Sequence, residues 1–334
     1  MGKLKALGIA IAAGCLIPTA AQADLNLSGQ VTPAFLVGGD VDDLEIVDNT
    51  GTGSRIRLKG KHKLGGIRFF TRYEIQIQEN QSFGAVDGSE SIDTRYAEAG
   101  VKGNFGTFSI GKGDGAANAT GEVSYQVSGN ILGAGHLPFF ATRGTLNRDN
   151  PGTPVTYTQF DAFSRNSRIR YDTPNFGGLV LSGSVTNAAG TGGVRTELAG
   201  RFKRKFGIGK ATVLVGLTDT DDGSNDQVLI GAGWKFNFGL SGSVQFGERT
   251  NIDAAGADLD DTEMLLLSIN YQIGKLVVSA DFGESGVDGE SELTQFGAEY
   301  HATKFFDIYA GVANYDNADG SDLSAGFGGF RYKF

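Results

Sequence analysis

The sequence has few cysteine, proline and tryptophan residues. Its 334 residues include one cysteine, Cys15, together with six prolines and one tryptophan. Beyond the first 23 residues, no apolar run reaches the roughly 20 residues that a membrane-spanning helix requires. A lone cysteine allows neither an internal disulfide nor a thiolate metal site. Stability must therefore come from backbone hydrogen bonds and side-chain packing.

Histidine is also scarce, and the spacings of common catalytic sites are absent. The chain has only His62, His136 and His301, and no Gly-x-Ser-x-Gly, His-Glu-x-x-His or Walker sequence. A hydrolase would need a nucleophile with an adjacent base. His62 lies beside a predicted turn and His301 at the end of a predicted strand. We therefore interpret both as surface residues and not as catalytic ones. We therefore expect no enzyme activity, no catalytic metal and no cofactor.

The N-terminus follows the plan of a secretory signal peptide. Two lysines precede an apolar run over residues 6–17, and small residues at 21–23 come before Asp24. About 12 apolar residues are too few for a retained membrane helix. We expect residues 1–23 to be removed, which leaves a mature chain of residues 24–334 without cysteine.

The charge balance is acidic. The chain has 29 Lys and Arg against 38 Asp and Glu, for a formal net charge of −9. Loss of the two leader lysines would make the mature chain −11. This charge argues against nucleic acid as a partner.

What the sequence does have is glycine and aromatic residues in quantity, with 52 Gly, 23 Phe and 10 Tyr. Aromatic residues favour strands, and glycine permits tight turns and close strand approach. Residues 67–78 alternate between an apolar face and a charged face. A charged inner face suits a wet lumen better than a tightly packed soluble core.

Similar alternation recurs along the whole mature chain and predicts about sixteen strands of membrane-spanning length. The predicted strands are 25–37, 55–63, 67–78, 95–102, 105–112, 167–171, 179–185, 194–202, 211–217, 228–236, 240–246, 265–273, 276–282, 293–300, 308–312 and 330–334. Because lipid cannot satisfy an open sheet edge, such strands must close into a barrel. The predicted fold is an all-β, 16-stranded antiparallel transmembrane β-barrel.

The predicted connections alternate between tight turns and longer polar stretches, as outer-membrane barrels do. The predicted long loops are 38–53, 80–92, 218–226, 248–262, 283–292 and 314–322. Several of them carry acidic clusters, whose oxygen-rich side chains are typical ligands of hard divalent cations such as calcium, so the loops are candidate sites for such cations. Acidic loops at the mouth also predict weak cation preference.

One connection, from Gly113 to about Phe163, is far longer than an ordinary loop. It mixes Gly, Asn and Thr with apolar residues, which predicts that it packs against a surface. In a barrel the surface available to it is the inner wall.

Alternation also predicts which arginines face the lumen. Arg55 and Arg57 oppose apolar neighbours, as do Arg168 and Arg170, so all four should point inward. Arg95 shares its parity with small apolar residues, which conflicts with an inward position.

Four segments make the chain resemble the general, trimeric porins of Gram-negative bacteria. They are Ser54-Arg55-Ile56-Arg57-Leu58-Lys59-Gly60; residues 94–111, which include Thr94-Arg95-Tyr96-Ala97-Glu98-Ala99-Gly100 and Phe105-Gly106-Thr107-Phe108; Arg168-Ile169-Arg170-Tyr171-Asp172-Thr173-Pro174; and the terminal Phe334. The resemblance implies a homotrimer in the outer membrane, in contact with lipid and lipopolysaccharide. It implies a water-filled pore for passive diffusion of small hydrophilic solutes and ions.

The resemblance also implies a constriction, in which a third loop at about 113–163 folds into the lumen. Basic residues on the wall would face acids on this loop. Arg55 and Arg95 match wall arginines of the family, whereas Gln30 replaces a residue that is often basic there. The basic side is then Arg55, Arg57, Arg95, Arg168 and Arg170.

The family's acidic loop signature is absent, so Glu122 is the first choice for an acidic partner and Asp114 the second. The aromatic last strand, with Phe330, Tyr332 and Phe334, implies recognition by the barrel-assembly machinery. Two other channel types stay open as alternatives. One is a substrate-specific channel and the other is a plugged structural or adhesive barrel.

Overall fold

The computed structural model describes residues 24–38, 41–49, 52–78, 91–118, 165–187, 193–221, 226–252, 258–286, 291–316 and 322–334. The predicted signal peptide and most of the long connection, including Glu122, lie outside these residues. Within the described residues, no helix is long and apolar enough to cross a membrane.

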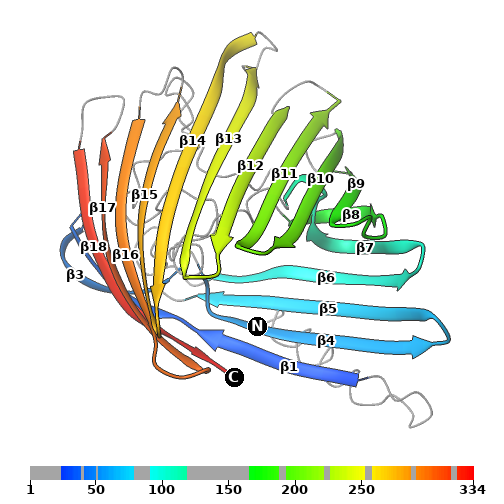
Figure 1. The fold of residues 1–334 in the computed structure, drawn as a ribbon, viewed down its shortest axis with the longest axis horizontal. Helices are drawn as coiled ribbons and strands as arrows, with labels where there is room; N and C mark the ends of the chain where they lie inside the picture. The colour runs from blue at the N-terminus through cyan, green and yellow to red at the C-terminus, as the bar shows by residue number, and fades with distance from the viewer. Residues whose placement is uncertain are drawn as a thin grey trace, which may run out of the picture.

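Eighteen strands form one antiparallel sheet that wraps into a barrel (Figure 1). They are β1 (Asp24–Val31), β2 (Pro33–Gly38), β3 (Val41–Asp48), β4 (Arg55–Leu64), β5 (Ile67–Gln78), β6 (Ser91–Gly103), β7 (Gly106–Asp114), β8 (Arg165–Asp172), β9 (Leu179–Asn187), β10 (Val194–Phe206), β11 (Gly209–Thr220), β12 (Gln227–Phe236), β13 (Leu240–Ile252), β14 (Asp258–Ile273), β15 (Leu276–Gly286), β16 (Ser291–His301), β17 (Phe306–Asp316) and β18 (Asp322–Lys333).

The sheet closes because the last strand pairs with the first two. Gln30 of β1 pairs with Lys333 of β18, and β2 continues along the same edge of β18. On their other side, β1 pairs with β4 and β2 pairs with β3. β1 and β2 therefore form one wall strand interrupted at Thr32, and β3 and β4 form the next. The barrel is thus sixteen-stranded, which confirms the predicted fold.

The interruption between β3 and β4 corrects the sequence analysis, which assigned residues 38–53 to a surface loop. Half of that stretch is β3, and the chain then turns inward before β4. Asn49 is buried, and its Nδ2 donates a hydrogen bond of 2.8 Å to the Tyr309 hydroxyl. Ser54 Oγ donates to Asp48 Oδ1 at 2.8 Å. The polar composition was misleading because backbone pairing does not require apolar side chains.

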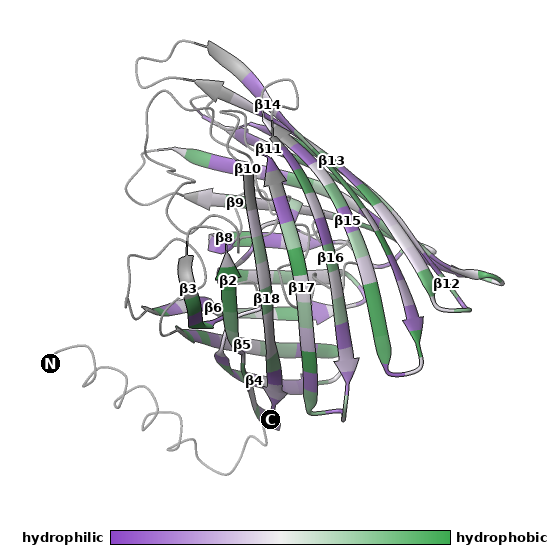
Figure 2. Ribbon diagram, turned by 90° about the vertical axis from the view of Figure 1, so that its left-hand side faces the viewer, coloured by the Kyte–Doolittle hydropathy of each residue, from purple (hydrophilic) through white to green (hydrophobic). Residues whose placement is uncertain are grey.

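The two faces of the wall differ as the alternation predicted. On β11, Val213, Val215 and Leu217 are exposed on the outside, whereas Thr212 and Leu214 are buried on the inside. Hydrophobic and hydrophilic segments alternate along β15, β16 and β17 (Figure 2). The barrel therefore presents an apolar exterior and a mainly polar interior.

One part of the interior is apolar. Side chains of β2, β3, β12, β14 and β16–β18 point inward and form a single buried cluster. Its members are Ala34, Leu36, Val47, Leu229, Met264, Leu266, Leu293, Tyr309, Ala313, Ala325 and Phe327. Charged side chains of the interior lie elsewhere, on β4–β8 and at the short-turn end of β16–β18.

One rim consists of short turns, at residues 65–66, 104–105, 173–178, 207–208, 237–239, 274–275 and 302–305. On the opposite rim, several strands extend into stretches that the sequence assigned to long loops. Ile252 pairs with Asp258, and Asp316 pairs with Asp322. Those predicted loops were too long, because polar residues continue the antiparallel ladder beyond the apolar band.

Closure of the barrel depends on Gly29. Its N–H donates to the Phe334 carbonyl at 2.9 Å, and the Phe334 N–H donates back at 3.1 Å. A Cβ atom at Gly29 would lie 2.3 Å from Phe334 Cζ and 2.7 Å from the Arg55 carbonyl oxygen. The ring can rotate away, but the Arg55 backbone cannot move without disturbing β4.

We therefore expect Gly29→Ala to destabilise the folded barrel by about 1–3 kcal/mol, the usual cost of overpacking. The measurement is the temperature at which the barrel converts from its compact to its unfolded band in SDS gels. Gly66→Ala is the control, because a Cβ there meets nothing within 4 Å. Equal melting temperatures for the two variants would contradict the importance of this contact.

Candidate functional site: an arginine cluster on the lumen wall

The charged centre of the lumen wall is Glu74 on β5, whose side chain is 0% exposed. Four arginine side chains surround its carboxylate. Glu74 Oε1 lies 3.2 Å from Arg55 Nη1 and 2.9 Å from Arg95 Nε. Glu74 Oε2 accepts hydrogen bonds from Arg57 Nε and, at 3.1 Å, from Arg72 Nη2. These five residues are called the arginine cluster below.

Strand register explains most of the arginine cluster. Arg57 pairs directly with Glu74 across β4 and β5, and Arg55 pairs with Gln76. Directly paired residues on neighbouring strands share a face, so these side chains meet without any loop rearrangement. Arg72 precedes Glu74 by two residues and also faces inward.

Arg95 reaches the cluster through an irregularity in β6. Glu74 pairs with Tyr96 but the next residue, Ile75, pairs with Thr94, so Arg95 is an extra residue in the ladder. Such a β-bulge lets two successive side chains point to one face. Arg95 Nη1 donates to Gln76 Oε1 at 2.6 Å. The bulge resolves the conflict between parity and an inward Arg95.

Tyr96 links the arginine cluster to the start of the long connection. Arg72 Cζ lies 3.2 Å from the centroid of the Tyr96 ring, within the range of a cation–π interaction. The Tyr96 hydroxyl donates to Asp114, with distances of 2.7 and 2.6 Å to its two carboxylate oxygens. Arg165 Nη1 lies 3.9 Å from Asp114 Oδ1. Asp114 therefore lies among basic and aromatic side chains of the wall.

Arg168 and Arg170 are on the same wall but have a different setting. Arg168 is 3% exposed and pairs with Glu98 at 2.6 Å. Its Nε donates to the Asp114 carbonyl at 2.9 Å, and Arg170 Nη1 donates to the Gly115 carbonyl at 2.6 Å. The structure thus places both guanidinium groups against the first backbone carbonyls of the long connection.

The same segment continues along the inner wall. The Ala116 N–H donates to Ser184 Oγ and the Ala117 N–H to Glu197 Oε2, both at 2.8 Å. Ser184 is on β9 and Glu197 on β10, and both are buried. The connection therefore begins by turning into the lumen, in the direction that its apolar content predicted.

The arginine cluster has a clear electrostatic consequence. Four guanidinium groups meet one carboxylate, which leaves an excess of positive charge on the lumen wall. The four arginine side chains are 17–28% exposed, so they keep donors at the surface of the lumen. Such donors suit carboxylate and phosphate groups, which guanidinium binds well.

Among the residues predicted for the basic side, the structure brings Arg55, Arg57 and Arg95 together and places Arg168 and Arg170 at the loop start. Their role in a constriction stays a prediction. The sequence analysis did not single out Glu74, Glu98 or Glu197 as acidic partners. Glu74 could have been found, because it shares the inward parity of Arg72 on β5.

Phe330 and Tyr332 of β18 and Phe334, which follows it, are exposed on the outside, as alternation predicts for a last strand with one apolar face. Their recognition by an assembly machinery stays a prediction.

Two loop acids accept hydrogen bonds from nearby backbone groups. Asp221 Oδ2 accepts from the Val194 N–H at 2.9 Å and Asp226 Oδ1 from the Thr220 N–H at 2.7 Å. Calcium at the acidic loops likewise stays a prediction.

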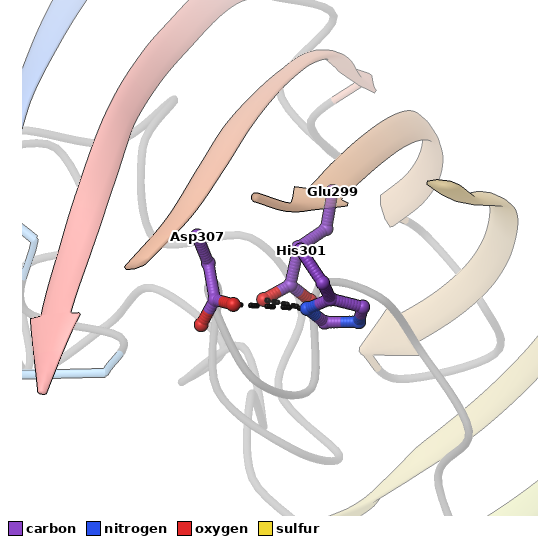
Figure 3. A group of neighbouring side chains, drawn as sticks. All are labelled: Glu299, His301 and Asp307. Carbon is purple, nitrogen blue, oxygen red and sulfur yellow. Dashed lines mark hydrogen bonds and ion pairs between the residues drawn. The ribbon is translucent and has the colours of Figure 1, made fainter. Parts of the chain in front are cut away.

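A second charged group lies at the short-turn rim. Glu299, His301 and Asp307 place their ligand atoms within 4.8 Å of one another, and both carboxylates point toward the His301 ring (Figure 3). Arg331 Nη2 lies 2.6 Å from Glu299 and 2.7 Å from Asp307, and Lys333 Nζ is 2.6 Å from Asp307. Cationic side chains thus already occupy these carboxylates. The group is a salt-bridge network across β16, β17 and β18.

The arginine cluster predicts a specific effect of Glu74→Gln on stability. Removing the carboxylate leaves four guanidinium groups facing one another without a counter-charge. We expect destabilisation of about 1.5–3 kcal/mol, the usual range for hydrogen bonds to charged groups. The measurement is urea unfolding of the barrel in detergent or vesicles. Glu284→Gln, the same change at an exposed position, is the control, and an equal midpoint for both would contradict a stabilising role of Glu74.

Comparisons with known proteins agree with this architecture. The sequence model of the Gram-negative porin family matches residues 9–320. The fold is similar to an anion-selective porin from Comamonas acidovorans, with a TM-score of 0.70, 18% identity, and coverage of 94% of this chain and 100% of that one. It is also similar to a loop-deletion mutant of OmpT, an outer membrane protein of Vibrio cholerae, with a TM-score of 0.64, 16% identity, and coverage of 93% and 99%.

A mutant porin of Rh. blastica matches with a TM-score of 0.63 at 16% identity, over 93% of this chain and 100% of that one. No curated protein sequence matches the chain significantly. The family match covers nearly the whole chain, and the barrel is sixteen-stranded like the predicted fold. The chain therefore belongs to the Gram-negative porin family and forms an outer-membrane porin channel.

Proposed function

We propose that this porin is a passive, weakly anion-preferring channel for small hydrophilic solutes, in which the arginine cluster sets the preference. The observation that carries the proposal is the ratio of charges on the wall, four guanidinium groups to one buried carboxylate. Rings or rows of charge at a narrow point of a pore determine which ions pass. The anion-selective porin from Comamonas acidovorans has a similar fold, which makes the proposal reasonable for this barrel.

This proposal differs from the weak cation preference predicted from the acidic loops. Charges at the mouth are screened in salt over roughly 8–10 Å. The arginine cluster lies on the inner wall, where a passing ion approaches the guanidinium groups closely and less water separates the charges. The nearer charges therefore have the larger effect on permeation.

A narrowed or plugged lumen is the second candidate. It is favoured by the apolar cluster on the inside of β12, β14 and β16–β18, where Leu229, Leu266 and Phe327 are at most 4% exposed. If this part of the wall faced open water, these side chains would be exposed to solvent. A barrel whose apolar inner wall is covered would conduct less than an open one.

Further parts of the proposal rest on family membership and on sequence. We propose that residues 1–23 direct export and are removed, that three copies associate in the outer membrane among lipid and lipopolysaccharide, and that the C-terminal strand is recognised during assembly. We also propose that the protein is a channel and not an enzyme.

Conductance of the purified protein in planar bilayers tests the pore. Conductance steps that occur in groups of three would support an open trimer. Absence of conductance would favour the plugged barrel, and block by a single sugar at micromolar levels would favour a substrate-specific channel.

The ion preference can be tested by reversal potentials in a KCl gradient. We expect the wild-type channel to pass chloride more readily than potassium. Arg55→Gln with Arg57→Gln should lower the chloride-to-potassium permeability ratio, because two positive charges leave the wall while Glu74 stays. Glu74→Gln should raise it.

Lys63→Gln is the control, since it removes a positive charge near the short-turn rim and away from the arginine cluster. Variants are compared only when they retain the compact band in SDS gels. A permeability ratio that moves equally in all variants, or one that favours potassium in the wild type, would contradict the proposal.

A further inference from the structure

The outer face of the barrel carries a groove in addition to the channel. It crosses β13–β17 close to the short-turn rim and has a volume of about 730 Å³. This lies within the range of small-molecule sites, about 300–1,000 Å³. The groove has no part in the lumen chemistry described above.

Strand pairing explains why the wall is hollow there. Ala280 pairs with Ile269 on one side and Phe296 on the other, and Ala298 pairs with Val278 and Ala310. Three alanines on successive strands thus form a shallow floor. Larger side chains border this floor. They are Ile269, Tyr271, Val278, Phe296 and Val312.

Two tyrosines and a phenylalanine indicate the depth of the groove in the membrane. Tyr271 borders the groove, Tyr300 lies two residues beyond Ala298 toward the short-turn rim, and Phe305 is in the short turn itself; all three are exposed on the outer face. Tyrosine side chains of barrels gather at the boundary between hydrocarbon and headgroups. The short-turn rim of such barrels faces the periplasm. The groove therefore opens into the periplasmic leaflet, which in an outer membrane consists of phospholipid.

Two lysines lie directly below the groove. Lys275 is in the turn between β14 and β15, and its Nζ donates to the Ala302 carbonyl of the neighbouring turn at 2.8 Å. Lys304 is in that neighbouring turn, with its Nζ 4.6 Å from the Phe305 ring centroid. Both side chains are exposed, and residues 274–275 and 302–305 contain no acid. Lys275 is three residues from Val278, about 10 Å along an extended strand.

We infer that this groove is a phospholipid site, in which an acyl chain lies over the three alanines and the headgroup phosphate contacts Lys275 and Lys304. An apolar groove alone would accept any acyl chain. The paired lysines add a preference for headgroups of net negative charge. Each lysine near a membrane surface contributes about 1 kcal/mol toward anionic lipid, which is about a fivefold change in affinity.

Quenching of a single tryptophan by brominated lipid tests the site. Trp234→Phe removes the native tryptophan, and Phe296→Trp places a reporter on the groove wall. The protein is reconstituted in phosphatidylcholine vesicles that contain a small fraction of phosphatidylglycerol with brominated acyl chains. We expect at least fivefold more quenching than from the same fraction of brominated phosphatidylcholine.

Three variants distinguish the contribution of the headgroup contacts from that of the apolar groove. Lys275→Gln with Lys304→Gln should abolish the difference between the two lipids. Lys205→Gln, which removes a lysine at the short-turn end of β10, should leave it unchanged. Ala298→Leu should reduce quenching by both lipids, and because its side chain faces outward the barrel should still give a compact band in SDS gels.

Equal quenching by the two brominated lipids in the wild-type background would overturn the inference, as would an unchanged difference in the double lysine variant. Absence of quenching by either lipid, with cross-linking between cysteines introduced at groove positions of different copies, would assign the groove to a second copy of the chain instead. None of these outcomes depends on ion preference, so the proposed channel function is tested separately.

Discussion

The need to pair every backbone group of the wall is the constraint on which the rest of this structure depends. In hydrocarbon an unpaired N–H or C=O costs several kcal/mol, so an open sheet edge cannot persist there. The chain meets this requirement by pairing β18 with β1 and β2, which closes sixteen wall strands into a ring. Closure then determines that alternate side chains face lipid or lumen.

The charged interior follows from that alternation. Strands β4 and β5 place arginines and Glu74 at directly paired positions, so opposite charges meet on one inner face. A buried carboxylate is tolerated because four guanidinium groups donate to it. The cluster has more positive than negative charge, and its partly exposed donors are available to solutes. Structural stability and the proposed ion preference thus depend on the same side chains.

The outer face uses the same alternation differently. Most outward positions carry large apolar side chains, but three alanines on neighbouring strands leave the groove above Lys275 and Lys304. The lumen and the outer face are separated only by the thickness of one strand, but successive side chains of that strand point to opposite faces. A change in an outward side chain therefore need not alter the channel, and the two faces can vary independently.

Several outcomes show how far local pattern predicts structure. Alternation placed Arg55 and Arg57 on the inner wall, where the structure has them. It failed at Arg95, because a β-bulge shifts the parity of β6 and only the pairing of Glu74 and Ile75 with β6 reveals the extra residue. It also failed at residues 38–53, where polar composition predicted a loop and the chain forms β3.

The sequence by itself determined the fold class, the approximate strands and the inward parity of most arginines, because side-chain direction in a strand depends only on a period of two. Only the tertiary structure decided that Glu74 is the carboxylate among the arginines, that Arg168 and Arg170 contact the start of the long connection, and that alanines on three strands form one groove. These features depend on strand register, which couples residues far apart in the chain and leaves no local pattern to read.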